Sequence, residues 1–449
     1  MKNKIIIAAL TLAAAACGGG TKGGAGGTIG TGKAPPPPPT VKPGGDGAGE
    51  KREISQDEKK DFDSAFGFFS SNDKGQWNDG ACRSAADKFT SVVRAHPNSV
   101  EAQYMVGLSF HRCNLLKEAE GAYQAAIRIK QNHGQSLSNL GEIYYRSGQN
   151  DAAKKYWDNA INANGKLVAA RNNLASMELE QLRKMPEKER DGKQWKELES
   201  DARFNLSNVL GVDSDNVKAY TLYGLVYMEG FQKNKSRLDL AKLLLDEANK
   251  RNPKFAPLQN AYGLYYMHRG ALSEALQHFT AAVEIDPKFI EARMNVGLTT
   301  LGFRKYDVAK DQFTKVLELQ SKNYDAVIGL GVALRGLKDF DGAEKQYKAA
   351  VALDGKRGEA YYNLAVLAKD FRATKLPPKE AIPVLKGAQG YFKDFISKGG
   401  DAKDLAEAKV QVGLIDKQIA SNEKFLKDQA SAPPPKPPAG GAAPPPAKP

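Results

Sequence analysis

Residues 260–287 read NAYGLYYMHRGALSEALQHFTAAVEIDP, and residues 294–321, which begin 34 positions later, read MNVGLTTLGFRKYDVAKDQFTKVLELQS. In the first stretch Gly263 is followed after twelve residues by Ala275, after four more by Phe279, and after three more by Ala282. Apolar residues at these spacings share one helical face. Each stretch therefore predicts two helices that approach closely at the small residues, with a ring packed between them. The residue before a proline is pushed out of the α region, so the second helix ends at Asp286-Pro287.

The same step of 34 residues recurs along the chain. The first-helix small positions are Gly107, Gly141, Ala175, Gly263, Gly297, Gly331 and Ala365. The second-helix alanines are Ala119, Ala153, Ala275, Ala309 and Ala343, and the rings are Tyr123, Trp157, Phe279, Phe313 and Tyr347. The small or β-branched residues that follow are Ala126, Ala160, Ala282, Val316 and Ala350.

Further repeats fit if insertions separate their two helices. The assigned sets are Ala175 with Ala202, Leu206 and Val209; Gly224 with Ala241, Leu245 and Ala248; and Ala365 with Ala381, Leu385 and Ala388. At the N-terminal end Ala85 and Phe89 have the same spacing to Gly107 that second-helix residues have in the other repeats. The first helix of this repeat is predicted over Phe62, Phe66 and Gly67. The insertion at residues 183–200 is interpreted as a solvated extension of the helices, with a contact arm as the alternative.

A period of 34 residues with this spacing resembles the tetratricopeptide repeat, a helix–turn–helix unit. The resemblance implies an all-α fold, a superhelical solenoid of about nine repeats over residues 51–398. We expect residues 399–428 to form a capping helix, because Leu405, Ala408, Val412, Ile415 and Ile419 lie on one stripe.

The first sixteen residues are typical of an export signal peptide. Lys2 and Lys4 precede an apolar run over residues 5–16, which is too short to span a bilayer as a helix. Cys17 follows at once, and this arrangement resembles the bacterial lipobox. The resemblance implies a lipoprotein whose Cys17 carries acyl chains such as palmitate. Gly18, in place of Asp, implies sorting to the outer membrane, facing the periplasm. The alternative is an ordinary signal peptide with an incidental cysteine.

Two segments lack apolar residues to bury. Glycine runs and Pro35–Pro39 make residues 17–50 a flexible tether behind the lipidated cysteine, with a reach of roughly 30 Å. Residues 429–449 form a Pro-rich disordered tail. The tail is interpreted as a solubilising end, or alternatively as a polyproline ligand or a strut into the cell wall.

Cys82 and Cys113 are the other two cysteines, and both map to one edge of the solenoid, one repeat apart. In an oxidising periplasm such thiols tend to pair, so we expect a disulfide. Two free, half-buried thiols are the alternative, because cysteines whose Cα atoms are more than about 7 Å apart cannot pair.

A partner-binding groove is implied by the family resemblance, in which the residue after the small position points inward. The apolar residues at that position and on the adjacent turns are Leu108, Leu225, Met228, Leu264, Met267, Met294, Leu298, Leu301, Ile328, Val332, Tyr362 and Val366. The family's peptide-binding asparagines would be Asn139, Asn173, Asn295 and Asn363. The alternative is that the apolar residues pack against neighbouring helices.

No motif points to catalysis. The sequence has neither a phosphate-binding glycine loop nor a Gly-x-Ser-x-Gly elbow, and His268 and His278 have no ligand spacing. We therefore expect no enzyme activity, cofactor, metal or small-molecule substrate. The net charge of +13 from 65 Lys+Arg and 52 Asp+Glu is moderate. Together with export, it favours anionic lipid, cell-wall polymer or acidic protein over nucleic acid.

Together these features predict a non-enzymatic, lipid-anchored periplasmic scaffold that binds protein partners of a cell-envelope complex. The plan is similar to that of gliding-motility tetratricopeptide lipoproteins of the bacterial outer membrane. Two alternatives are a pilotin-like lipoprotein that assembles an outer-membrane secretin of a pilus or secretion system, and a regulator of a cell-wall enzyme.

Overall fold

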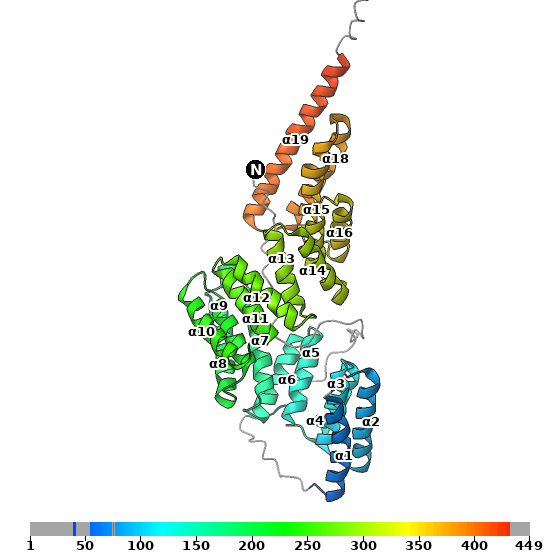
Figure 1. The fold of residues 1–449 in the computed structure, drawn as a ribbon, viewed down its shortest axis with the longest axis vertical. Helices are drawn as coiled ribbons and strands as arrows, with labels where there is room; N and C mark the ends of the chain where they lie inside the picture. The colour runs from blue at the N-terminus through cyan, green and yellow to red at the C-terminus, as the bar shows by residue number, and fades with distance from the viewer. Residues whose placement is uncertain (1–38, 42–53, 74, 76, 432–449) are drawn as a thin grey trace, which may run out of the picture. The chain divides into compact units, whose positions relative to one another are not determined.

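The computed structural model describes residues 39–41, 54–73, 75 and 77–431, and every regular element in these ranges is helical (Figure 1). The predicted signal peptide, Cys17, and most of the tether and Pro-rich tail lie outside the described residues. The chain divides between Val296 and Gly297, within α13 (Ile290–Gly302), into two compact units. Their described parts are the N-terminal unit, residues 39–296, and the C-terminal unit, residues 297–431.

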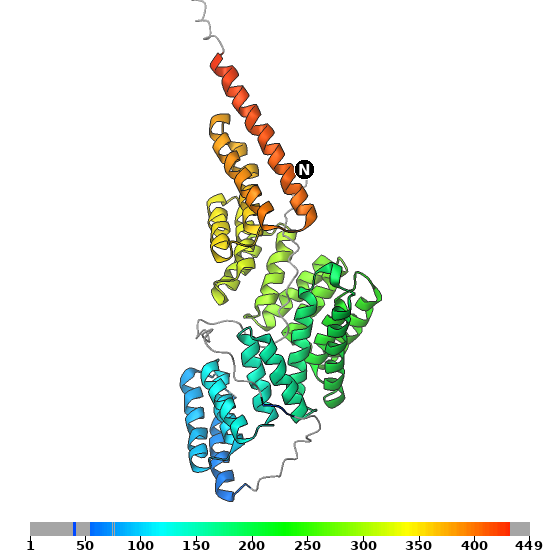
Figure 2. The same ribbon diagram turned by 180° about the vertical axis from the view of Figure 1, so that it is seen from behind.

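The N-terminal unit is a series of antiparallel helix pairs, and the two helices of each repeat contact one another (Figures 1 and 2). Its pairs are α1 (Gln56–Asp73) with α2 (Asp79–Ala95), α3 (Val100–Arg112) with α4 (Leu116–Ile129), α5 (Gly134–Arg146) with α6 (Asn150–Ala163), α7 (Val168–Lys184) with α8 (Lys193–Val212), α9 (Val217–Met228) with α10 (Ser236–Arg251), and α11 (Ala256–His268) with α12 (Leu272–Ile285).

The C-terminal unit continues the pattern and confirms the expected all-α solenoid with a C-terminal helix. It contains the end of α13, then α14 (Tyr306–Leu319), α15 (Tyr324–Gly336), α16 (Phe340–Leu353), α17 (Glu359–Val366), the π-helical turn η2 (Leu367–Arg372), the 3₁₀ turn η3 (Ala373–Lys375), α18 (Pro378–Lys398) and α19 (Ala402–Ser431). In both views α19 runs alongside α18 (Figures 1 and 2).

The small positions exist because a ring lies against the helix backbone there. A Cβ built on Gly141 would lie 2.5 Å from the Trp157 ring, and one on Gly263 would lie 2.4 Å from the Phe279 ring. Phe313 shows the same contact twice, because a Cβ on Gly297 or on Gly329 would lie within 2.8 Å of its ring. Each ring therefore lies between the two helices of its own repeat, as predicted, and Phe313 also lies against the first helix of the next repeat.

The repeats with insertions are also formed. Their assigned second-helix residues are buried: Ala202, Leu206, Val209, Ala241, Leu245, Ala248, Ala381, Leu385 and Ala388. The last insertion is accommodated by the π turn η2 and the 3₁₀ turn η3, since each extends the chain beyond α17 before α18 begins.

Two details differ from expectation. In α1 the buried stripe is Ala65 and Phe69, whereas Phe66 is 45% exposed and Gly67 has no heavy atom within 4 Å of a built Cβ. The insertion at 183–200 forms the end of α7, the turn η1 (Glu187–Glu189) and the start of α8, but it is not simply solvated. Trp195 is buried within it, because Arg237 of α10 reaches across to this region.

Buried ion pairs hold this insertion in place. Arg237 donates to Glu199 at 2.7 Å, and Arg183 donates to Glu229 at 2.9 Å. All four side chains are less than 15% exposed. Breaking such a pair by removing one partner leaves a buried charge uncompensated, which is strongly destabilising.

Helix α19 covers the end of the C-terminal unit. Ala408, Ile415 and Ile419 are buried in one cluster with α18, and Leu405 and Val412 pack against it. The predicted stripe is therefore the packed face of this helix, which ends at Ser431, just beyond the predicted boundary at residue 428.

A disulfide joins Cys82 of α2 to Cys113, which caps the C-terminal end of α3. Their Cα atoms are 6.2 Å apart, inside the range that a disulfide spans without backbone movement. The bond ties the first repeat to the second.

Candidate functional site

The apolar residues predicted to line a groove are mostly covered by neighbouring helices. The buried members of this set are Leu225, Met228, Leu264, Leu301, Ile328, Val332 and Tyr362. Their predicted exposure is wrong for a physical reason: the first helices of consecutive repeats touch one another, α9 with α7 and α11, and α15 with α17. Inward positions on these helices therefore form core.

Leu108, Met267, Met294, Leu298 and Val366 remain partly exposed. Met267 lies in the N-terminal unit, where it packs at the edge of the cluster containing Leu264. Leu298 and Val366 lie in the C-terminal unit. These residues are the predicted inward positions that stay partly exposed, although Val366 packs against the buried cluster of α17 to α19. Their role in binding stays a prediction.

The four predicted asparagines already have partners within the chain. Asn139 donates to the Tyr123 hydroxyl at 2.9 Å, and Asn173 accepts from Lys218 at 3.5 Å. Asn295 is buried, and its side-chain amide donates to the side-chain oxygen of Asn260 at 2.8 Å.

Asn363 is likewise buried, and it accepts from Arg335 at 3.2 Å and donates to the Glu359 main-chain carbonyl at 2.9 Å. Binding a peptide backbone through these side chains would require exchange of existing hydrogen bonds. Peptide binding by the asparagines is not tested by this geometry.

A polar surface on α3, α5 and α7 was missed by the sequence reasoning. Arg146 donates to Glu142 at 2.6 Å, and Tyr145 of α5 donates to Glu180 of α7. His111 of α3 lies 3.8 Å from Glu142, and burial lowers the pKa of this imidazole. The signal was present in the sequence, since Glu142 directly follows the small residue Gly141.

A cavity of about 430 Å³ opens between α6, α7 and α8. Its lining residues are Lys154, Asp158, Ile161, Asn162, Arg171, Leu174, Glu178, Asp201, Phe204 and Asn205. Glu178 is buried at its wall, and the Asn205 amide donates to both carboxylate oxygens at 3.3 Å. Burial raises the pKa of Glu178 to about 7, despite the lowering effect of the Asn205 hydrogen bond.

The cavity is polar and carries both signs of charge, so it suits a polar segment better than an apolar anchor. Arg171 donates to Asn205 at 3.3 Å and to the Gly165 carbonyl at 3.1 Å. Sequence reasoning did not find this site because the insertion before α8 changes which residues face α7.

Comparison with protein families identifies the repeat. Residues 75–133, 234–288 and 297–358 match one tetratricopeptide repeat family, and residues 134–166 match another. These segments coincide with helix pairs whose small positions and rings are in contact. The array is built of tetratricopeptide repeats. Such repeats are protein-interaction modules, and proteins of this fold are typically scaffolds rather than enzymes.

The chain is similar to several solved structures. A protein from Parabacteroides merdae is 14% identical, with a TM-score of 0.46, and the match covers 62% of this chain and 100% of that one. PilF of Pseudomonas aeruginosa is 18% identical, with a TM-score of 0.39 and coverage of 54% and 99%. A thermophilic protein of Thermus thermophilus is 24% identical, with a TM-score of 0.38 and coverage of 45% and 99%. A comparison with curated protein sequences gives no match.

The described ranges, residues 39–41, 54–73, 75 and 77–431, bear on metal binding and on membrane spanning. In these ranges no three His, Cys, Asp or Glu side chains gather in an arrangement that could hold a metal ion. None of the helices described is both long and apolar enough to cross a membrane.

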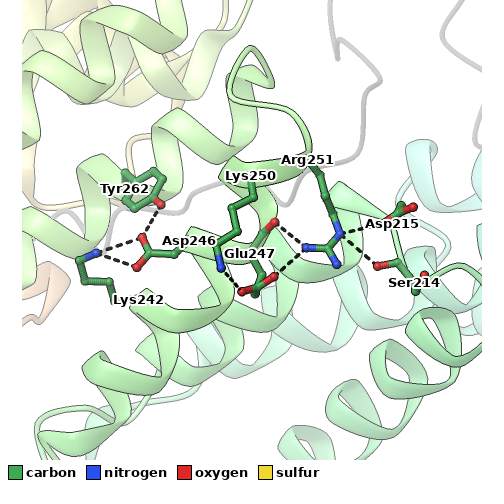
Figure 3. Close-up of polar contacts among 8 residues, drawn as sticks. All are labelled: Ser214, Asp215, Lys242, Asp246, Glu247, Lys250, Arg251 and Tyr262. Carbon is green, nitrogen blue, oxygen red and sulfur yellow. Dashed lines mark hydrogen bonds and ion pairs between the residues drawn. The ribbon is translucent and has the colours of Figure 1, made fainter.

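Charged residues of the tetratricopeptide repeat formed by α9 and α10 bond mainly to one another (Figure 3). Asp246 of α10 accepts from the Tyr262 hydroxyl of α11 at 2.7 Å and from Lys242 at 2.8 Å. Arg251 donates to Glu247 at 2.9 Å and to Asp215, before α9, at 3.1 Å. The two groups of contacts are separate, and the bond between Asp246 and Tyr262 joins α10 to the first helix of the next repeat.

Proposed function

We propose that this tetratricopeptide repeat array is a lipid-anchored scaffold that binds protein partners of a cell-envelope complex at the periplasmic face of the outer membrane. The specific complex we propose is the gliding-motility machinery, on the basis of the shared plan of lipidated cysteine, tether and repeats. The general part of this proposal is that the array binds proteins, and the repeats themselves support it.

The observation that supports export is the distribution of the three cysteines. Cys82 and Cys113 are joined in a disulfide, and stable disulfides belong to oxidising compartments such as the periplasm. Cys17, the remaining cysteine, follows the short apolar run at the N-terminus. A periplasmic lipoprotein accounts for both observations, because its disulfide would form in an oxidising compartment and its remaining cysteine would be acylated.

We assign partner contact in the C-terminal unit to the inward positions that stay partly exposed, Leu298 and Val366. Apolar side chains exposed on an inner face gain free energy when a partner covers them. The buried inward positions, such as Val332, support the array instead.

A pull-down from membranes with a mild detergent tests this assignment. The double variant Leu298→Ser with Val366→Ser is expected to recover less partner while keeping its helical circular dichroism. Because Val366 also packs against the buried cluster of α17 to α19, the melting temperature of this variant is expected to fall by several degrees. The matched control is Val308→Ser with Leu353→Ser, which changes two exposed apolar residues on the second helices α14 and α16. Equal recovery from all three proteins contradicts the assignment.

A further inference from the structure

A short N-terminal segment lies against the third repeat, far from its place in the sequence. Val41 contacts α6, although more than a hundred positions separate them in the sequence. The Val41 main-chain N–H donates to the Asn159 side-chain oxygen at 3.2 Å, and the Asn162 amide donates to the Val41 carbonyl at 3.2 Å. The Val41 side chain is partly buried against the cluster formed by α4 to α7.

The two asparagines are suited to this contact by their spacing. Residues three apart on a helix are neighbours on one face, so the Asn159 and Asn162 side chains project together. Each side-chain amide has both a donor and an acceptor, like a peptide group. The pair therefore satisfies both polar main-chain groups of Val41, as the edge of a β-strand does for a residue that pairs with it.

The asparagine pair is peculiar to α6. Asn159 and Asn162 stand two and five residues after the ring Trp157. The corresponding pairs in the other second helices are Ser91 and Arg94, Ala125 and Arg128, Asn208 and Gly211, Glu247 and Lys250, Ala281 and Glu284, Lys315 and Glu318, Ala349 and Ala352, and Gly387 and Gly390. The repeat pattern does not require asparagine at these two positions. We therefore attribute the pair to its contact with Val41.

We propose that Asn159 and Asn162 form a main-chain-binding site on α6, and that its ligand is Val41 of the same chain. The site recognises the donor and acceptor of one residue together with a small β-branched side chain. Asn162 also lines the cavity between α6, α7 and α8, so the docked segment lies at the edge of that cavity. Docking fixes the N-terminal segment on the third repeat, and it does so whether or not Cys17 is lipidated.

Amide hydrogen exchange on the full chain tests the proposal. In the wild type the Val41 amide is expected to exchange at least about ten-fold more slowly than in a free peptide of residues 35–46, because it donates a hydrogen bond. The double variant Asn159→Ala with Asn162→Ala is expected to restore the free-peptide rate. Asn208→Ala is the matched control, since it removes an exposed asparagine at the corresponding position of α8, and it should leave the Val41 rate slow.

Helical circular dichroism and thermal melting on the same proteins establish that α6 stays folded. A Val41 amide that exchanges at the free-peptide rate in the wild-type chain overturns the proposal. A Val41 amide that stays protected in the folded double variant also overturns it.

Discussion

Substitution of Gly141 by alanine should destabilise the array, although alanine is the better helix former. The new Cβ would lie 2.5 Å from Trp157 Cδ1 and Nε1, whereas carbon atoms in contact are normally 3.5–4.0 Å apart. The indole must therefore move by about 1 Å. The ring is only 1% exposed, and its Nε1 donates to the Ser138 carbonyl at 3.0 Å, so movement also weakens that hydrogen bond.

Three contributions determine the expected change in the free energy of unfolding. Overpacking a core costs about 1–3 kcal/mol, and weakening one hydrogen bond costs about 1 kcal/mol. Replacing glycine by alanine inside a helix stabilises the folded state by about 1 kcal/mol. We expect the free energy of unfolding of the Gly141→Ala protein to fall by about 1–3 kcal/mol, which lowers the melting temperature by several degrees.

Gly121→Ala is the matched control. Gly121 lies inside α4 and has no heavy atom within 4 Å of a built Cβ, so the helix-propensity gain of about 1 kcal/mol should appear unopposed. Thermal and urea melts followed by circular dichroism and indole fluorescence measure both variants. The reasoning is refuted if Gly141→Ala melts at or above the wild-type temperature.

Three further predictions use the same melts. Glu178→Gln should raise the free energy of unfolding by up to about 3 kcal/mol at pH 8, because burial raises the pKa of this carboxyl to about 7. The folded protein holds the carboxyl proton more tightly than the unfolded chain, so its stability is lost as pH rises from about 4.5 through 7. The gain should therefore vanish below pH 4.5, and a gain that is the same at pH 4 and pH 8 contradicts this cause. Reducing the Cys82–Cys113 disulfide, which closes a loop with a sequence separation of 31, should destabilise the first two repeats by about 3–4 kcal/mol, and a double alanine variant should be insensitive to reductant. Leu264→Ala should lose about 2–5 kcal/mol because the side chain is buried, and an unchanged melting temperature would show that it is exposed after all.

The helix pairs were predictable because their packing depends on small and large residues that recur at fixed spacings in the sequence. Gly263 and Phe279 show this clearly, since a ring that touches the helix backbone leaves room for nothing larger than glycine. The first helix of the array was placed less well. Neither Phe62 nor Phe66 has a nearby glycine in such contact, so spacing alone did not reveal that Phe66 faces outward.

The candidate surfaces were less predictable than the fold. Spacing placed Leu264 on the inward side of α11 but could not say how closely α9 approaches it, and that approach buries the side chain. The contact of Val41 with α6 is not related to the 34-residue repeat, so the repeat pattern could not predict it. It joins two segments whose only common feature is matched hydrogen-bonding groups, which become visible once both are placed in three dimensions.

The proposed attachment of the array to a membrane through Cys17 is the feature on which the proposed envelope function most depends. Cells expressing the full chain or its Cys17→Ala variant are labelled with an alkyne palmitate, and their membrane and soluble fractions are compared. We expect the wild-type protein to carry the label in the outer-membrane fraction, and the Cys17→Ala protein to lose the label and the membrane association together. A Cys17→Ala protein that stays labelled and membrane-bound contradicts the proposed anchor, and so does an unlabelled, soluble wild type.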